Sequence, residues 1–353
     1  MQARAHFLLV FTSCALAAGL AAVREERVAS AAPGGSAPHE SIASAASRNA
    51  SCASCHEAET RTWEKSQHHT AASDASYKTA VAIEPLAFCR GCHAPSADPN
   101  VVTPAAAEAL GIGCIHCHDA PPTSAANTAG ATTRKGPHGV MQSKSCASCH
   151  EFAFPDPPAR LMQSTREEHA RSAYATTSCT ECHMKRDAQG QVDHASIVSS
   201  DPEMLQRAVK VRVTRASDTR IAVRLAPGAV GHAFPTGDLF RRLRVSVRAL
   251  GDDGVMVAER HRFLQRHFGL LRSGEQLVRA ETKDDRPGGR DAQACFEMAL
   301  PKEASARPWE LSLAYQRVDH PRSETELDLA LVSQSTIVFK ETLAPSSALE
   351  PCP

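Results

Sequence analysis

Apolar and polar residues alternate, or apolar residues run together at strand length, along the chain from about residue 205 onward. This pattern occurs at residues 209–213, 221–225, 243–250, 255–258, 311–315 and 336–339. Turn signals such as Ala-Pro-Gly and Asp-Asp-Gly stand between these segments, as expected for consecutive strands. The spacing predicts an antiparallel β-sandwich domain over residues 206–345.

Strand-like alternation is almost absent from residues 51–205, where short helical segments and loops are expected. The fold class is therefore α+β: a loop and short-helix domain at 51–205, followed by the β-sandwich domain. Residues 23–50 are rich in Ala, Ser, Gly and Pro, which predicts a flexible linker.

The N-terminus has the pattern of an export signal. Arg4 precedes the apolar run HFLLVFTSCALAAGLAA at 6–22, and small residues end the run. We expect a signal peptide over residues 1–22 and a periplasmic or exported mature chain. The run is short for a spanning helix and no other candidate exists, so no transmembrane helix is expected after cleavage. The early position of Cys14 argues against a lipoprotein anchor, while peripheral membrane association stays open.

Charge and composition narrow the function. Lys and Arg together number 39 and so do Asp and Glu, so no basic surface indicates a nucleic-acid partner. Aromatic residues make up only 5% of the chain, which is low for a protein that must build its own core. A large apolar cofactor would supply the missing surface.

Ten of the thirteen cysteines belong to five copies of one motif, Cys-x-x-Cys-His. The copies are SCASCHE at 51–57 and again at 145–151, CRGCH at 89–93, CIHCH at 114–118 and CTECH at 179–183. Zinc sites take four ligands, so such pairs should come in twos with more distant histidines. A thioredoxin-like site needs a single pair within a βαβ pattern, which is absent here. The motif is therefore the signature of covalent haem attachment.

In this motif both thiols form thioethers to one haem, and the adjacent histidine becomes the proximal ligand of the iron. We expect five c-type haems. The attachment residues are Cys52, Cys55, Cys89, Cys92, Cys114, Cys117, Cys146, Cys149, Cys179 and Cys182. The proximal ligands are His56, His93, His118, His150 and His183. All five motifs fall within residues 52–183, too short a segment to enclose each haem separately, so the haems should pack against one another.

A second histidine on each iron would complete a bis-His haem, and the other histidines outnumber the positions to be filled. Candidates close to the motifs or in a Gly/Pro turn are His68, His138, His194 and His232. His169 is a further candidate, although in a faint internal repeat it stands where Trp63 does, which indicates a packing position. Each of these histidines could instead be an ordinary surface residue.

Cys295 and Cys352 lie outside the motifs, in or just beyond the β-sandwich domain. In an oxidising compartment they could form a disulfide with each other or remain free thiols, because geometry decides the pairing.

Several segments resemble a family of exported multihaem c-type cytochromes related to the cytochrome c-554 group. They are W-x-x-S-x-H at 63–68, CHAP at 92–95, GIGCIHCH at 111–118, CHM at 182–184 with His194 behind it, and GHAFPTG at 231–237 leading into RRLRVSV at 241–247. The resemblance implies closely stacked haems, an appended β domain and electron transfer. It also implies that His232 approaches a haem from the β domain. Two positions depart from the family: no asparagine precedes GHAFPTG, and His169 stands where Trp is common.

Two classes of function remain. The first is an electron carrier, not an enzyme, that transfers electrons between donor and acceptor proteins through closely packed, mostly bis-His haems. The second is a multihaem reductase or oxidase of a small nitrogen or sulfur compound, in which one iron lacks a distal ligand. All five motifs end in His, which favours the carrier.

Overall fold

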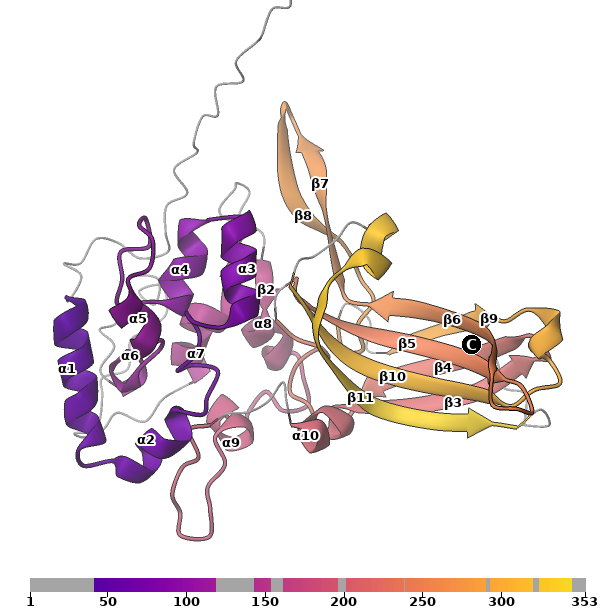
Figure 1. Ribbon diagram of the computed structural model, residues 1–353, viewed down its shortest axis with the longest axis horizontal. Helices are drawn as coiled ribbons and strands as arrows, with labels where there is room; N and C mark the ends of the chain where they lie inside the picture. Colours follow the sequence, from indigo (N-terminus) through magenta and orange to yellow (C-terminus); the bar gives the residue numbers. More distant parts are fainter. Residues whose placement is uncertain are drawn as a thin grey trace, which may run out of the picture.

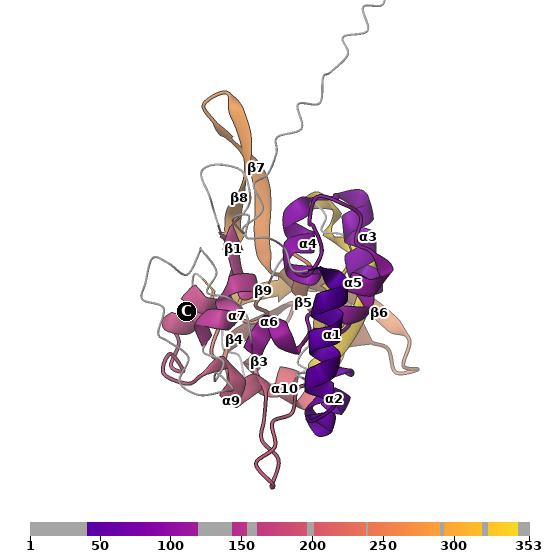
Figure 2. The ribbon, with the colours of Figure 1, turned by 90° about the vertical axis from the view of Figure 1, so that its left-hand side faces the viewer.

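The structure, a computed structural model, describes residues 41–118, 143–153, 161–195, 201–237, 239–289, 293–319 and 324–344. A half built mainly of short helices lies beside a β-sheet half (Figure 1). Seen along the line that joins them, the helices stand in front of the sheets (Figure 2). The expected signal peptide at 1–22, together with Cys14, His138 and Cys352, lies outside the described residues.

The helical half consists of short helices and one small strand pair. The helices are α1 (Ile42–Ala53), α2 (Glu57–Trp63), α3 (Ala75–Ile83), α4 (Ala87–His93), α5 (Ala105–Leu110), α6 (Cys114–His118), α7 (Ser143–His150), α8 (Thr165–Ala170) and α9 (Cys179–His183). Strands β1 (Glu151–Ala153) and β2 (Leu161–Ser164) pair antiparallel. Side-chain caps start several helices: Asp74 accepts from the Tyr77 amide, and Ser178 forms a capping box with Glu181. None of the described helices has the length and apolar character needed to cross a membrane.

Helix α1 corrects one expectation, because it occupies residues 42–53 and so includes the end of the predicted flexible linker at 23–50. Its sequence is rich in alanine, the strongest helix former, and the Ser41 side chain caps its first turn. Ala45 is fully buried, in one apolar cluster with Leu110 and Ile115. The composition of this segment is that of a linker, but its packing against α5 and α6 holds it as a helix.

The β half holds one helix, two larger sheets and one two-stranded sheet. Helix α10 (Pro202–Arg207) is followed by β3 (Val209–Ser217), β4 (Arg220–Pro227), β5 (Arg241–Leu250), β6 (Met256–Leu264), β7 (Arg266–Ser273), β8 (Gln276–Asp284), β9 (Ala294–Ala299), β10 (Trp309–Val318) and β11 (Val332–Leu343), with short 3-10 turns at Lys302–Ala304 and Glu324–Leu329. The sheets have the orders β11-β10-β5-β6 and β3-β4-β9, and every pairing is antiparallel. All six strands expected from the sequence are confirmed.

The hairpin β7–β8 and strand β9 were not expected from the sequence. The hairpin turns at Gly274, whose φ of 64° lies in the left-handed region, and it projects from the body of the molecule (Figure 1). In this hairpin only Val278 and Ala280 are buried apolar residues, whereas Leu270 and Leu277 are exposed, so too few apolar positions are buried for a strand pattern to reveal it. Cys295, on β9, is disulfide-bonded.

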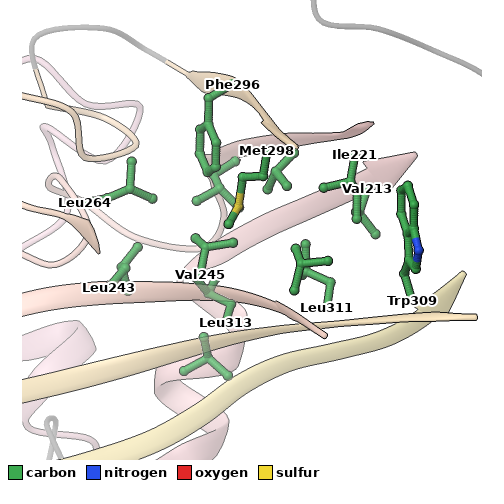
Figure 3. Close-up of a cluster of buried hydrophobic side chains, with 14 of the residues drawn as sticks. Val213, Ile221, Leu243, Val245, Leu264, Phe296, Met298, Trp309, Leu311 and Leu313 are labelled. Atoms are coloured by element: carbon green, nitrogen blue, oxygen red, sulfur yellow. The ribbon is translucent and has the colours of Figure 1, made fainter. Parts of the chain in front are cut away.

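The core of the β half lies between the two sheets (Figure 3). Ile221 from one sheet and Leu243 and Leu311 from the other are all fully buried there. Leu205 of α10 belongs to the same cluster, so the β half begins before residue 206, the start expected from the strand pattern. Apolar burial of this extent makes the β half stable through its own side chains.

The helical half has much less apolar core. Its clusters consist of four alanines, Ala72, Ala94, Ala97 and Ala107, of the small group around Leu110, and of Phe88 with Met162, against which residues of both halves pack. Alanine buries little surface, so these contacts contribute only a small part of the hydrophobic free energy that a domain of this size requires. The helical half therefore needs a source of stability besides its described side chains.

The sandwich core can be tested with Leu311→Ala. We expect a loss of about 2–5 kcal/mol in the free energy of unfolding of the β half, because the substitution removes buried surface and leaves a cavity. Leu331→Ala is the control, since Leu331 is 64% exposed and should change stability by less than about 0.5 kcal/mol. Urea denaturation followed by far-UV circular dichroism measures both. Equal stability of the two variants would contradict the assignment of the core.

Candidate metal centres

The second to fifth Cys-x-x-Cys-His motifs each form one helical turn that ends at the histidine. They lie in α4, α6, α7 and α9. In a helix, residues i, i+3 and i+4 share one face, so both thiols and the imidazole point to the same side. The first motif differs: Cys52 is near the end of α1, whereas Cys55 and His56 follow it and His56 begins α2.

Three motif histidines face a second histidine from a distant part of the chain. The ring centres are 6.2 Å apart in each of the pairs His68–His150, His118–His194 and His183–His232. With metal–nitrogen bonds of about 2.0 Å, and the ligating nitrogen about 1.1 Å from its ring centre, two imidazoles on opposite sides of one metal have ring centres about 6.2 Å apart. The spacing therefore fits an iron atom between the two rings of each pair.

Hydrogen bonds at Nδ1 turn several of these rings toward ligation. The Nδ1 atom of His93 lies 2.7 Å from the Ala71 carbonyl oxygen, that of His194 2.9 Å from Val192, and that of His232 2.9 Å from Ala233. A carbonyl only accepts, so Nδ1 carries the proton and Nε2 keeps the lone pair that binds a metal. His150 Nδ1 instead lies 3.3 Å from the side-chain amide of Gln163.

The environment keeps three of the paired histidines neutral, which is the form that binds metal. Burial lowers the pKa of His68 and of His232. Burial, with the nearby His232 and Arg207, lowers the pKa of His183 to about 4. These rings are uncharged at neutral pH.

His68 is held by contacts that explain the W-x-x-S-x-H and GIGC segments. The Trp63 indole donates to the Ile112 carbonyl at 2.9 Å, and the Ile112 amide donates to the His68 carbonyl at 2.9 Å. Gly111 has a φ of 55°, and a Cβ there would lie 2.1 Å from the His69 carbonyl oxygen. Only glycine fits at this position, and its close approach fixes the turn that carries His68.

His194 and His232 are positioned by loops that cross between elements. The His194 amide donates to the Thr62 hydroxyl at 3.0 Å, which ties the loop after α9 to α2. Beside His232, a Cβ on Gly231 would lie 3.0 Å from the His169 ring and 3.3 Å from Tyr174 Cβ. Gly231, the first residue of GHAFPTG, thus allows α8 and the turn after it to approach the loop.

Two predicted ligands remain to be placed. His138 lies outside the described residues. His169 packs on Gly231, beside the His183–His232 pair, and among the described residues its ring has no contact with the histidine of a motif. In the internal repeat His169 stands where Trp63 does, and Tyr174 stands where His68 does.

Sequence reasoning missed several residues beside the motifs. Tyr77 stacks on His93 with ring centres 4.0 Å apart and planes 7° apart. Burial and the nearby thiols, with a smaller contribution from Glu108, raise the pKa of Tyr77 to about 12, so its hydroxyl stays protonated. His116, inside the third motif, lies with its Nε2 atom 2.8 Å from the Ser96 hydroxyl, which links the third motif to the turn after the second. This contact lies outside the motif pattern, so the 114–118 segment alone did not reveal it.

The cysteines show which motifs are neighbours. The side chains of Cys92 and Cys149 lie beside each other, which joins the second and fourth motifs, and those of Cys146 and Cys179 join the fourth and fifth in the same way. Cys117 lies near Cys149, so the third motif also adjoins the fourth. The cluster has the fourth motif at its centre.

The first motif adjoins the third. Burial and the nearby Cys52 raise the pKa of the Cys114 thiol. Asn49 of α1 accepts a hydrogen bond from the Cys114 amide at 2.6 Å. The motifs therefore follow one another in space as first, third, fourth and fifth, with the second beside the fourth.

A buried polar network joins the two halves behind His232. The Thr236 hydroxyl, in the GHAFPTG segment, donates to the Glu168 carboxylate of α8 at 2.7 Å and lies 2.9 Å from the Thr165 hydroxyl. Arg286 donates to the same carboxylate at 2.6 Å and to the Pro235 carbonyl at 2.7 Å. The loop that carries His232 is thus fixed to the helical half by charged and neutral hydrogen bonds.

Comparison with known proteins gives two matches. The model of the family described as cytochrome c554 and c-prime matches residues 51–119, which contain the first three motifs. The fold is similar to the crystal structure of a penta-heme cytochrome c552 from Thermochromatium tepidum, with a TM-score of 0.56 and 19% identity. That match covers 86% of this chain and 100% of the other. No curated protein sequence matches significantly.

The joint between the halves can be tested with Thr236→Val. The Glu168 carboxylate would lose one donor in a buried position, so we expect the joint to weaken by about 1–3 kcal/mol. Hydrogen–deuterium exchange should then accelerate in the peptides that cover 161–170 and 231–240. Thr342→Val, an exposed position on β11, is the matched control and should leave both peptides unchanged. Unchanged exchange in Thr236→Val would contradict a role in joining the halves.

Proposed function

Because this chain is a multihaem c-type cytochrome related to cytochrome c554, we propose that it passes electrons from a donor protein to an acceptor protein through five covalently attached haems. Haem iron supplies this chemistry by alternating between its ferric and ferrous states, one electron at a time. The observation that carries the proposal is the set of three imidazole pairs with ring centres 6.2 Å apart. A metal with an imidazole on each side offers no position to a substrate, which suits electron transfer.

The ligand assignment follows these pairs. His150 and His68 would hold the haem of the fourth motif, His118 and His194 that of the third, and His183 and His232 that of the fifth. His56 and His93 would be the proximal ligands of the first and second. His138 and His169 stay the candidates for their distal positions, on the sequence alone.

The contacts between motifs support a continuous path. The Cys52–Cys114 and Cys117–Cys149 neighbours connect the first motif to the fourth through the third. The fifth motif adjoins the fourth through Cys146 and Cys179. Attachment residues this close would place neighbouring haems side by side, so an electron could move along the series without leaving the protein.

Docking positions for the two redox partners are proposed at the ends of this series. Among the attachment cysteines, Cys55 of the first motif and Cys182 of the fifth are the exposed ones, and the others are partly buried. Exposure at both ends and burial between them suits a conduit with a separate entrance and exit. Covalent haem attachment agrees with the predicted export signal, so we place the protein in the periplasm or beyond.

The count and state of the haems can be measured together. Intact-mass spectrometry should show five haems per chain, and low-temperature EPR of the oxidised protein should show only low-spin signals, because each iron would have two axial ligands. A high-spin component near one-fifth of the total would instead reveal one open iron. That result would reject the pure carrier and favour a reductase or oxidase.

The ligand assignment predicts the effect of single substitutions. His68→Ala, His194→Ala and His232→Ala should each convert one low-spin haem to high-spin, because each removes one of two imidazoles from an iron. His232→Ala should also make the junction between the halves more sensitive to protease, since that ligand comes from the β half. EPR and limited proteolysis measure the two effects.

His261→Ala is the matched control. This histidine also belongs to the β half, but it bonds Asp328 and not a motif histidine. Its EPR spectrum should equal that of the unmodified protein. If a ligand variant kept its full low-spin signal, the corresponding pair would be wrong.

A further inference from the structure

Three charged side chains are buried together where the two halves meet. Glu168 of α8, Asp284 of β8 and Arg286 are exposed by only 2%, 6% and 3%. The guanidinium of Arg286 lies 2.6 Å from the Glu168 carboxylate and 2.8 Å from that of Asp284. Two carboxylates and one guanidinium leave this triad with one net negative charge. Buried charge is weakly screened, so its field extends to neighbouring groups.

The triad is attached directly to the loop that carries His232. Arg286 donates to the Pro235 carbonyl at 2.7 Å, and Glu168 accepts from Thr236 at 2.7 Å. The loop also receives support from Pro287, whose carbonyl accepts from the Phe234 amide at 3.0 Å. Any shift of these side chains would move the segment between His232 and β5.

The charges also act on the imidazole itself. The Glu168 carboxylate and the Arg286 guanidinium both lie close enough to His232 to interact with its ring electrostatically. On the opposite side, Arg207 lies near His183 and adds a positive charge that the variants below leave in place.

We propose that Glu168, Asp284 and Arg286 position His232 and that their net negative charge lowers the reduction potential of the haem between His183 and His232. Reduction at this site adds one electron from the donor protein and removes one positive charge from the iron. A fixed negative charge nearby stabilises the ferric state and disfavours that step. The proposal rests on the ligand assignment made above.

A purely structural role would not require the unbalanced charge. Buried ion pairs add little stability compared with apolar residues of similar volume, so an apolar contact would join the halves equally well. A triad with two acids and one base is more readily explained by its effect on a charged neighbour. Tuning of a haem by charges beyond its ligands is a general property of such sites.

The test is a charge series measured by spectroelectrochemical titration of the holoprotein. Glu168→Gln makes the triad neutral, so one of the five midpoint potentials should rise. We expect about a tenfold change in the equilibrium constant for reduction, which is about 59 mV for one electron. The double variant Glu168→Gln with Arg286→Gln restores one net negative charge, so the potential should return toward its original value.

The matched control is Glu167→Gln. Glu167 is the neighbouring residue but is 51% exposed and pairs with Arg171 on the surface. All five potentials should stay unchanged in this variant, because solvent screens an exposed charge. If Glu168→Gln does not assemble, Asp284→Asn removes the same charge from another position and should raise the same potential.

The outcomes separate the two proposals. His232→Ala identifies the signal of the haem concerned. If His232→Ala alters no signal, the ligand assignment fails. If it alters one signal but Glu168→Gln leaves that potential unchanged or lowers it, the charge proposal alone is overturned. A double variant that moves the potential further up would show that the triad acts only through structure, which also overturns it.

Discussion

The helical half of this protein depends on pairs of imidazoles brought face to face from distant segments. Its apolar clusters are small, namely four alanines, the group around Leu110, and Phe88 with Met162. They bury too little surface to hold together the nine short helices that the structure describes there. The pairs join residue 68 to 150, 118 to 194 and 183 to 232, so each would close a long loop when both rings bind one iron. Ligation of a metal by distant residues stabilises a fold in the same way as a structural zinc site.

The β half is built on the opposite principle. Its two sheets enclose branched apolar side chains, with Trp309 at one end of that core (Figure 3). The Arg215 guanidinium lies 3.7 Å above the Trp309 ring. A core of this extent makes the β half a suitable support for the loop of His232. Glu168 and Arg286 tie the same loop to the helical half, so in our proposals this loop would carry a ligand, a mechanical link and a source of electrostatic field.

Cysteine-rich motifs and strand patterns were predictable because they depend on local chemistry. The spacing within Cys-x-x-Cys-His is set by the reach of two thiols and one imidazole, and strands β3, β4, β5 and β10 have the alternation that a half-buried sheet requires. The hairpin β7–β8 was missed because only Val278 and Ala280 of its strands are buried apolar residues and its leucines are exposed. Helix α1 looked like a linker because alanine and serine are common in linkers and in helices alike. Only its contact with Leu110 and Ile115 shows that this segment is a packed helix.

The sequence by itself predicted where haems attach, which histidine is proximal at each motif, and which histidines were available as partners. It could not pair them, because His68 and His150 or His118 and His194 meet only after several turns have folded back. The order of the motifs in space, with the fourth at the centre, likewise arises from contacts such as that between Cys92 and Cys149. The buried triad at residues 168, 284 and 286 was hidden for the same reason: charges far apart in the chain become one electrostatic unit only when tertiary packing removes the water between them.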